Sequence, residues 1–247
     1  MTLVERLRAA GCVFAEDEAA LLVEAAASAD ELERMTRRRV AGEPLEVVVG
    51  WAAFHGLRIA IEPGVFVPRQ RTTGFLADQA IALAPHTLLD LCCGSGAVAA
   101  SVIAAVPSAE VYAADVDPAA VHCARRNLPA DRVFEGDLFD ALPAHLRFDV
   151  IVANAPYVPT EAIALMPAEA RESEPLITLD GGADGLDVHR RIAARALERL
   201  LPGGHLLIEV NEEQGPTAAL IFERSGLRAR IAHDKELEAT VVIGRAP

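Results

Sequence analysis

The sequence is poor in aromatic residues, in positive charge and in long apolar runs, and each shortage excludes a class of protein. Aromatic residues make up 4% of the 247 residues, so aliphatic side chains and Ala must fill the core. The formal net charge of −13 argues against an extended nucleic-acid surface, because phosphates require many Lys and Arg side chains. No apolar run reaches the length of a membrane span.

Cysteine is also scarce, with Cys12, Cys92, Cys93 and Cys123 as the four examples. Their spacing fits neither a zinc site nor a disulfide framework, so we expect free thiols and no metal site. The N-terminal residues 1–6 lack the basic-then-apolar layout of a signal peptide. Together these features predict a cytoplasmic protein.

Hydrophobic residues make up 52% of the chain, and their pattern predicts three parts. Residues 1–40 carry apolar stripes at helical spacing and predict a small helical domain. Residues 41–71 predict a connector with a β-hairpin, in which runs at 51–54 and 57–61 flank His55-Gly56.

Residues 72–247 alternate between strands and helices, which predicts an α/β domain with a mostly parallel sheet covered on both faces. The expected strands cover 87–92, 110–115, 131–135, 148–153 and 204–210, with two more between 227 and 244. The expected helices cover 72–84, 96–105, 118–127, 185–200 and 213–225.

Three expected strands end in glycines or acids. The first is followed by the loop Cys92-Cys93-Gly94-Ser95-Gly96, which lets the backbone approach a ligand in front of a helix N-terminus. Asp115 ends the next strand and is placed to accept hydrogen bonds from ribose hydroxyls. Asp137 follows the third strand, where it can accept a hydrogen bond from an exocyclic amine. The ordered set predicts a nucleotide-like cofactor, although each Asp alone would also fit a helix cap or turn.

NAD is the competing cofactor. The loop lacks the full G-x-G-x-x-G spacing, because Cys92 occupies the place of the first glycine and Val98-Ala99 follow Gly96. The adjacent pair Cys92-Cys93 is typical of small buried apolar residues.

The tetrad Asn154-Ala155-Pro156-Tyr157 follows the apolar strand 148–153. In an open α/β sheet, ligands bind at the carboxyl ends of strands. The Asn154 side-chain oxygen and the Ala155 carbonyl could each accept one N–H of an amide, and the Tyr157 ring could pack on it. An ordinary turn after a strand is the alternative for the tetrad taken alone.

With these motifs in place, the sequence from about residue 38 onward resembles the release factor glutamine N5-methyltransferases. The collinear motifs include Val65-Phe66-Val67-Pro68-Arg69, Asp90 to Gly96, Asp115-Val116-Asp117-Pro118, Gly136-Asp137-Leu138-Phe139, the Asn154 tetrad and Leu179 to Leu186. The resemblance implies a Rossmann-like class I methyltransferase fold with an antiparallel C-terminal strand. It also implies methyl transfer from S-adenosylmethionine, with S-adenosylhomocysteine as product, to the Gln of a Gly-Gly-Gln loop.

The resemblance also implies roles for individual residues. The catalytic and substrate-binding residues would be Asn154, Ala155, Pro156 and Tyr157. The cofactor would be held by Asp90, Cys92, Gly94, Gly96, Asp115, Val116, Asp137, Leu138 and Asn154. Arg171 and Glu174 are weaker candidates that would line the entrance or cap a helix, and His189 and His205 are expected to be structural.

The sequence departs from the family pattern at four places. Ala155 replaces the first Pro of Asn-Pro-Pro-Tyr, and Cys92 replaces a Gly. Gln70-Arg71-Thr72-Thr73 stands where the family usually has Pro-Glu-Thr-Glu. The N-terminal helical part has about half of the usual length.

These departures leave three alternatives open beside a protein glutamine acceptor. They are a small-molecule amide or amine, a nucleic-acid amino group, and cofactor binding without turnover. The acidic charge disfavours the nucleic-acid alternative.

Overall fold

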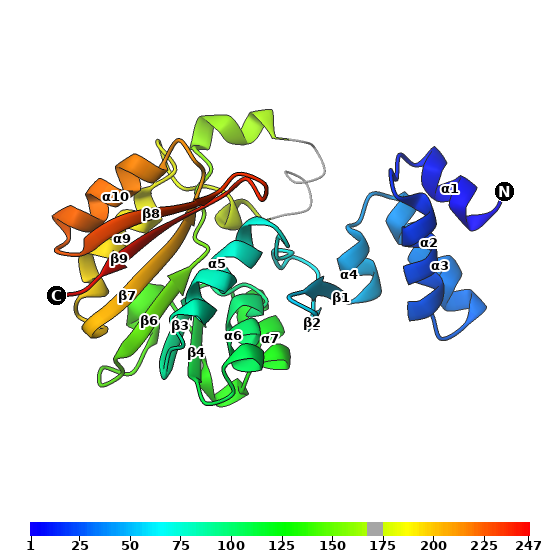
Figure 1. Cartoon of the computed structure of the whole chain (residues 1–247). Coiled ribbons are helices and arrows are strands. Elements are labelled where there is room, and N and C mark those ends of the chain that lie inside the picture. The colour runs from blue at the N-terminus through cyan, green and yellow to red at the C-terminus, as the bar shows by residue number, and fades with distance from the viewer. Residues whose placement is uncertain (167–174) are drawn as a thin grey trace.

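The computed structural model describes residues 1–166 and 175–247 (Figure 1). A seven-stranded sheet with the order β5-β4-β3-β6-β7-β9-β8 forms the centre of the larger part of the molecule. Its strands are β3 (Thr87–Leu91), β4 (Glu110–Asp115), β5 (Val133–Glu135), β6 (Phe148–Ala153), β7 (Leu200–Val210), β8 (Arg228–Asp234) and β9 (Ala239–Arg245). Only β9 runs against its neighbours β7 and β8, so the predicted fold class is confirmed.

Helices cover both faces of this sheet, as the alternating pattern predicts. On one face they are α5 (Thr72–Ala82), α6 (Ala97–Ala105) and α7 (Pro118–Asn127), and on the other α9 (Asp187–Ala196) and α10 (Gly215–Arg224). The two cores are aliphatic and alanine-rich: Ala97, Ala99 and Ala100 let α6 pack closely on the sheet. In the part of the chain that the structure describes there are also four short 3₁₀ helices, at Ala130–Arg132, Leu138–Ala141, Thr160–Leu165 and Leu176–Thr178.

Strand β3 is the point where the chain changes direction across the sheet. Strands β4 and β5 lie on one side of it, and β6 and β7 on the other. Leu91 at the end of β3 pairs with Ala114 of β4 and with Ala153 of β6. The loops that follow these three residues therefore leave the sheet at one rung, which is where ligands bind in open α/β sheets.

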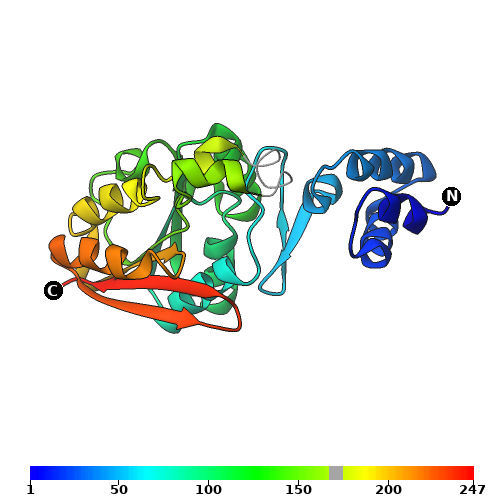
Figure 2. The same ribbon diagram turned by 90° about the horizontal axis from the view of Figure 1, so that it is seen from above.

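The N-terminal part forms its own helical unit, set apart from the sheet in both views (Figures 1 and 2). It consists of α1 (Leu3–Ala9), α2 (Ala15–Ala25), α3 (Ala29–Val40) and α4 (Leu45–Val49). Helix α1 begins with a Thr2 capping box, and Gly11 follows its end in a left-handed conformation (φ 93°). Leu7, Leu22 and Val48 bury their side chains in one small core.

Helix α4 differs from the sequence prediction, which assigned all residues from 41 to 71 to a connector. Gly42-Glu43-Pro44 interrupts the helical pattern, but the interruption is short: α3 ends at Val40 and Pro44 is already the N-cap of α4. The predicted hairpin follows as β1 (Trp51–Phe54) and β2 (Leu57–Ala60), joined at His55-Gly56. It docks on α7, where the Asn127 side chain accepts from the Ala60 N–H (2.8 Å).

Two other boundaries differ for local reasons. Residues 131–132, predicted as strand, belong to the 3₁₀ turn Ala130–Arg132, since Pro129 precedes them and favours a turn. Strand β7 begins at Leu200, before the predicted residue 204, and its pairing with β6 shifts between Phe148 and Val150. Pro202 cannot donate to the ladder and Gly203 is left-handed (φ 76°), which explains the irregularity.

Candidate functional site

A cavity of about 640 Å³ opens at the carboxyl ends of β3, β4 and β6. Its wall contains all of the sequence-predicted site residues except Gly96, which lies directly behind it at the N-cap of α6. The predicted cofactor and acceptor motifs therefore meet in one place. Arg171 and Glu174 lie outside the described residues.

The glycine loop forms the floor of the cavity and depends on left-handed backbone. Gly94 has φ 54°, and a Cβ there would meet nothing within 4 Å, so the missing side chain leaves open space for a ligand. Gly96 has φ 76°, and a Cβ there would lie 2.7 Å from Leu128 Cδ1. Gly94 thus leaves space open at the cavity, whereas Gly96 permits the close packing of α6 against Leu128.

Cys92 is also left-handed, with φ 54°, although it is not a glycine. A left-handed conformation is one that glycine adopts without strain, which explains why the family pattern has Gly at the position that Cys92 occupies here. Burial raises the pKa of its thiol further above the ordinary value, so the thiol stays protonated and apolar.

Asp115 holds the glycine loop from the end of β4. Its Oδ2 accepts from the Gly94 N–H (2.9 Å) and its Oδ1 from the Asp117 N–H (3.0 Å). Burial raises the pKa of Asp115, and hydrogen bonds from the backbone of Asp117, Gly94 and Val116 partly offset that rise.

Asp90 lies beneath the loop, 2% exposed, and its Oδ2 accepts from the Ala99 N–H (3.1 Å). Burial raises the pKa of Asp90 to about 8, and the Asp115 charge adds to the rise. Asp137 is more exposed and pairs with Arg191 of α9 (2.5 Å). Carboxyl groups and apolar side chains such as Val116 and Leu138 therefore line one cavity, a lining suited to a nucleoside, which has both polar groups and apolar surface.

The Asn154 tetrad forms the opposite wall. The Asn154 Nδ2 donates to the Thr73 Oγ1 (3.0 Å), which leaves its Oδ1 as an acceptor. Ala155 is 1% exposed and packs in the core shared with α9 and α10, so packing restrains the residue that Pro would otherwise stiffen. Within the described parts of the chain, no hydrogen bond occupies the Ala155 carbonyl.

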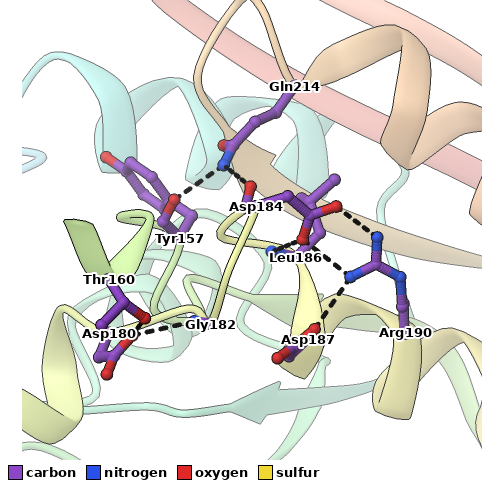
Figure 3. A network of polar contacts seen from close by, with 9 residues as sticks. All are labelled: Tyr157, Thr160, Asp180, Gly182, Asp184, Leu186, Asp187, Arg190 and Gln214. Carbon is purple, nitrogen blue, oxygen red and sulfur yellow. Dashed lines mark hydrogen bonds and ion pairs between the residues drawn. The ribbon is translucent and has the colours of Figure 1, made fainter. Parts of the chain in front are cut away.

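A loop from Asp180 to Asp187 holds the end of the tetrad (Figure 3). The Gln214 Nε2 donates to the Tyr157 carbonyl (2.8 Å) and to the Asp184 carbonyl (3.0 Å). A Cβ on Gly185 would overlap the Tyr157 carbonyl, so only glycine permits this approach. Arg190 pairs with Asp184 and Asp187 and closes the loop onto α9.

The structure also places four residues at the site that the sequence argument missed: Thr73, Arg191, Glu209 and Gln214. Glu209 carried a readable signal, because it is an acid inside the apolar run 206–210. His189, expected to be structural, is buried outside the cavity wall: its Nε2 lies 3.1 Å from the Glu209 carbonyl oxygen, its Nδ1 has no hydrogen-bond partner among the described residues, and burial lowers its pKa to about 4.

The comparisons with known proteins agree with this geometry. Residues 56–170 match the family model for the methyltransferase small domain. The chain is 39% identical over 200 residues to the release factor glutamine methyltransferase of Geobacter sulfurreducens, covering 78% of this chain and 69% of that protein. The chain belongs to the release factor glutamine methyltransferase family. Its relative from Moorella thermoacetica is 40% identical over 200 residues, covering 77% of this chain and 70% of that protein.

Solved structures support the fold. A methyltransferase from Pyrococcus furiosus superposes with a TM-score of 0.58 at 18% identity, over 77% of this chain and 89% of that chain. The ribosomal protein L11 methylase of Lactobacillus delbrueckii subsp. bulgaricus gives a TM-score of 0.54 at 16% identity, over 76% and 84%. These likenesses show the class I methyltransferase fold.

Family membership confirms the predicted enzyme class, an S-adenosylmethionine-dependent N-methyltransferase. It also favours a protein glutamine acceptor over the small-molecule and nucleic-acid alternatives. The cavity fits this cofactor on its own chemistry, since its lining offers carboxyl groups for hydroxyl and amino groups, and the space above Gly94 admits the amino-acid end of the molecule. Among the described residues, none of the helices could cross a membrane and no acid, His or Cys cluster could hold a metal ion.

Proposed function

We propose that this chain methylates the side-chain amide nitrogen of the glutamine in a release factor's Gly-Gly-Gln loop. The observation that supports it most directly is the orientation of Asn154. Its Nδ2 is bonded to Thr73, so its oxygen and the Ala155 carbonyl are two acceptors beside one cavity. A primary amide has two N–H groups to donate to such a pair.

The chemistry asks the protein to position a poor nucleophile. An amide nitrogen is weakly nucleophilic because its lone pair is delocalised into the carbonyl. S-adenosylmethionine supplies an electrophilic sulfonium methyl group. The two acceptors would hold the NH₂ in line with that group and stabilise positive charge that develops on nitrogen. The nitrogen can lose its proton after transfer, so the site needs no strong base.

We further propose how the other half of the cavity holds the cofactor. Gly94 and Gly96, with Asp90 and Cys92 behind them, would receive the methionine part. Asp115, which lines the cavity, would accept hydrogen bonds from the ribose hydroxyls, with Val116 beside it. Asp137 and Leu138 would lie near the adenine. A release factor works on ribosomes, so we place the enzyme in the cytoplasm.

The test is methyl transfer from labelled S-adenosylmethionine to purified release factor. The matched control is the same factor with Gly-Gly-Glu in place of Gly-Gly-Gln. We expect one label per factor on the glutamine and none on the control. Nucleic acid and small amides are offered separately. Label on either of these, with none on the release factor, would refute the proposal.

A further inference from the structure

Glu209 is a buried acid that the proposed chemistry does not use. It is 1% exposed on β7, one residue beyond Ile208, which pairs with Ala153. Its position in the sheet is therefore beside Asn154. The Tyr157 hydroxyl donates to its Oε1 (3.3 Å), and its Oε2 has no hydrogen-bond partner within residues 1–166 and 175–247. Burying a carboxylate is costly, so its place behind the acceptor wall needs an explanation.

The hydroxyls around Glu209 connect it to the site. Burial raises the pKa of Glu209, and the hydroxyl groups of Thr72, Thr73 and Tyr157 partly offset the rise. Thr73 is itself buried, 3% exposed, near the start of α5. Its oxygen also receives the Asn154 Nδ2. Thr73 thus stands between Glu209 and Asn154.

The proton of Thr73 decides the orientation of Asn154. A hydroxyl group has one proton and two lone pairs. When the proton points to Glu209, the oxygen can only accept from Asn154. The amino end of the Asn154 amide must then face Thr73, and its oxygen must face the cavity.

We propose that Glu209 and Thr73 are positioning residues that lock the Asn154 amide with its oxygen toward the acceptor and so select a glutamine amide over a glutamate carboxylate. The inference rests on the proposed role of Asn154. An oxygen-only wall receives the two N–H groups of an amide. The same wall repels a carboxylate, which has no N–H to donate. A freely flipping Asn154 would present its NH₂ part of the time and would tolerate the carboxylate.

The test compares Thr73→Val with Thr73→Ser, since Val removes the hydroxyl at nearly constant shape and Ser keeps it. Thr72→Val is the matched control, because the Thr72 hydroxyl also lowers the pKa of Glu209 but makes no hydrogen bond to Asn154. For each variant, kcat, the Kd for cofactor, and the Kd for release factor carrying Gly-Gly-Gln or Gly-Gly-Glu are measured.

We expect Thr73→Val to lower kcat about 10-fold or more, since misaligned acceptors lose positioning. The preference for Gly-Gly-Gln over Gly-Gly-Glu should shrink by a similar factor. Thr73→Ser should stay within about threefold of wild type in both, and Thr72→Val should lose less than Thr73→Val. Glu209→Gln, whose NH₂ would compete for the Thr73 oxygen, should resemble Thr73→Val.

An unchanged Gln-over-Glu preference in Thr73→Val would overturn the inference, as would a Thr73→Ser enzyme as impaired as Thr73→Val. If Glu209→Gln does not fold, the two Thr73 variants still decide. Failure of the proposed function looks different, because the wild-type enzyme would then not label a release factor at all.

Discussion

The glycine loop and the Asn154 tetrad leave neighbouring strands at the same rung of the sheet, yet they are held in place by different kinds of contact. Asp115 orders the loop through backbone N–H groups of Gly94 and Asp117, and left-handed glycines shape it. The tetrad instead depends on side chains from other elements: Thr73 of α5, Glu209 of β7 and Gln214 before α10. The glycine loop, on the proposed methyl-donor side of the cavity, is therefore held mainly by its own backbone conformation. The Asn154 tetrad, on the proposed methyl-acceptor side, is held by side chains that reach it from distant parts of the sequence.

The largest expected effect would separate the two halves completely. Asn154→Ala removes the proposed acceptor oxygen while leaving the glycine loop intact. We expect kcat to fall about 10²–10³-fold. The Kd for S-adenosylmethionine, measured by calorimetry, should change less than about threefold. A parallel loss of cofactor affinity would mean that the two halves are not independent.

Asp115→Ala is the corresponding test of the donor half. It removes both the proposed ribose contact and the hydrogen bond to Gly94, so we expect cofactor affinity to fall about 10–100-fold. Asp149→Ala is the matched control. Asp149 also accepts two backbone N–H groups, from His86 (3.1 Å) and Thr87 (2.8 Å), but outside the cavity. Equal cofactor affinity in both variants would remove Asp115 from the site.

Gly94→Ala tests whether the glycine loop leaves room for the cofactor. The new methyl group occupies open space in the cavity, and the backbone of residue 94 is strained because alanine rarely adopts φ 54°. We expect cofactor affinity to fall about 10-fold, with a stability cost of about 1–2 kcal/mol. Gly203→Ala provides the control, because φ 76° imposes similar strain away from the cavity. Its Tm should fall similarly while its cofactor Kd stays unchanged.

The smallest expected effect concerns the protonation of Asp90. Its pKa of about 8 in the folded protein exceeds the ordinary 3.8, so the folded state binds its proton more tightly than the unfolded state. The contribution of protonated Asp90 to the free energy of unfolding is therefore fully present at low pH and is lost as the pH rises from about 4 to 8. Asp90→Asn is neutral throughout and keeps an acceptor for the Ala99 N–H.

Without cofactor, Asp90→Asn should raise the free energy of unfolding by about 1 kcal/mol at pH 8. The gain should vanish near pH 4. Denaturant unfolding at the two pH values measures it. A gain that is the same at both values would show that burial does not keep Asp90 protonated.

The same contrast explains what the sequence could predict. Strands 110–115 and 148–153 and helix 118–127 agree with prediction to the residue, because apolar runs, Asp117 and Pro118 mark their ends locally. The glycine loop and Asp115 could be recognised from spacing for the same reason. Thr73 and Gln214 could not, since they lie 81 and 57 residues from the tetrad residues that they bond. Glu209 stands out as an acid in an apolar run, but its contact with Tyr157, 52 residues away, could not be predicted. The helix α4 was missed because only its contact with the N-terminal core reveals it.

The pairing of Leu91 with Ala153 has a consequence for how this enzyme can change over time. Neighbouring strands lie about 4.8 Å apart, and this spacing is fixed by backbone hydrogen bonds. The sheet thus fixes the distance between the starting points of the glycine loop and the Asn154 tetrad, whatever their side chains are. If Ala155 and Thr73 have the roles proposed above, substitutions at these positions can change the preferred acceptor without changing the distance between the two loops.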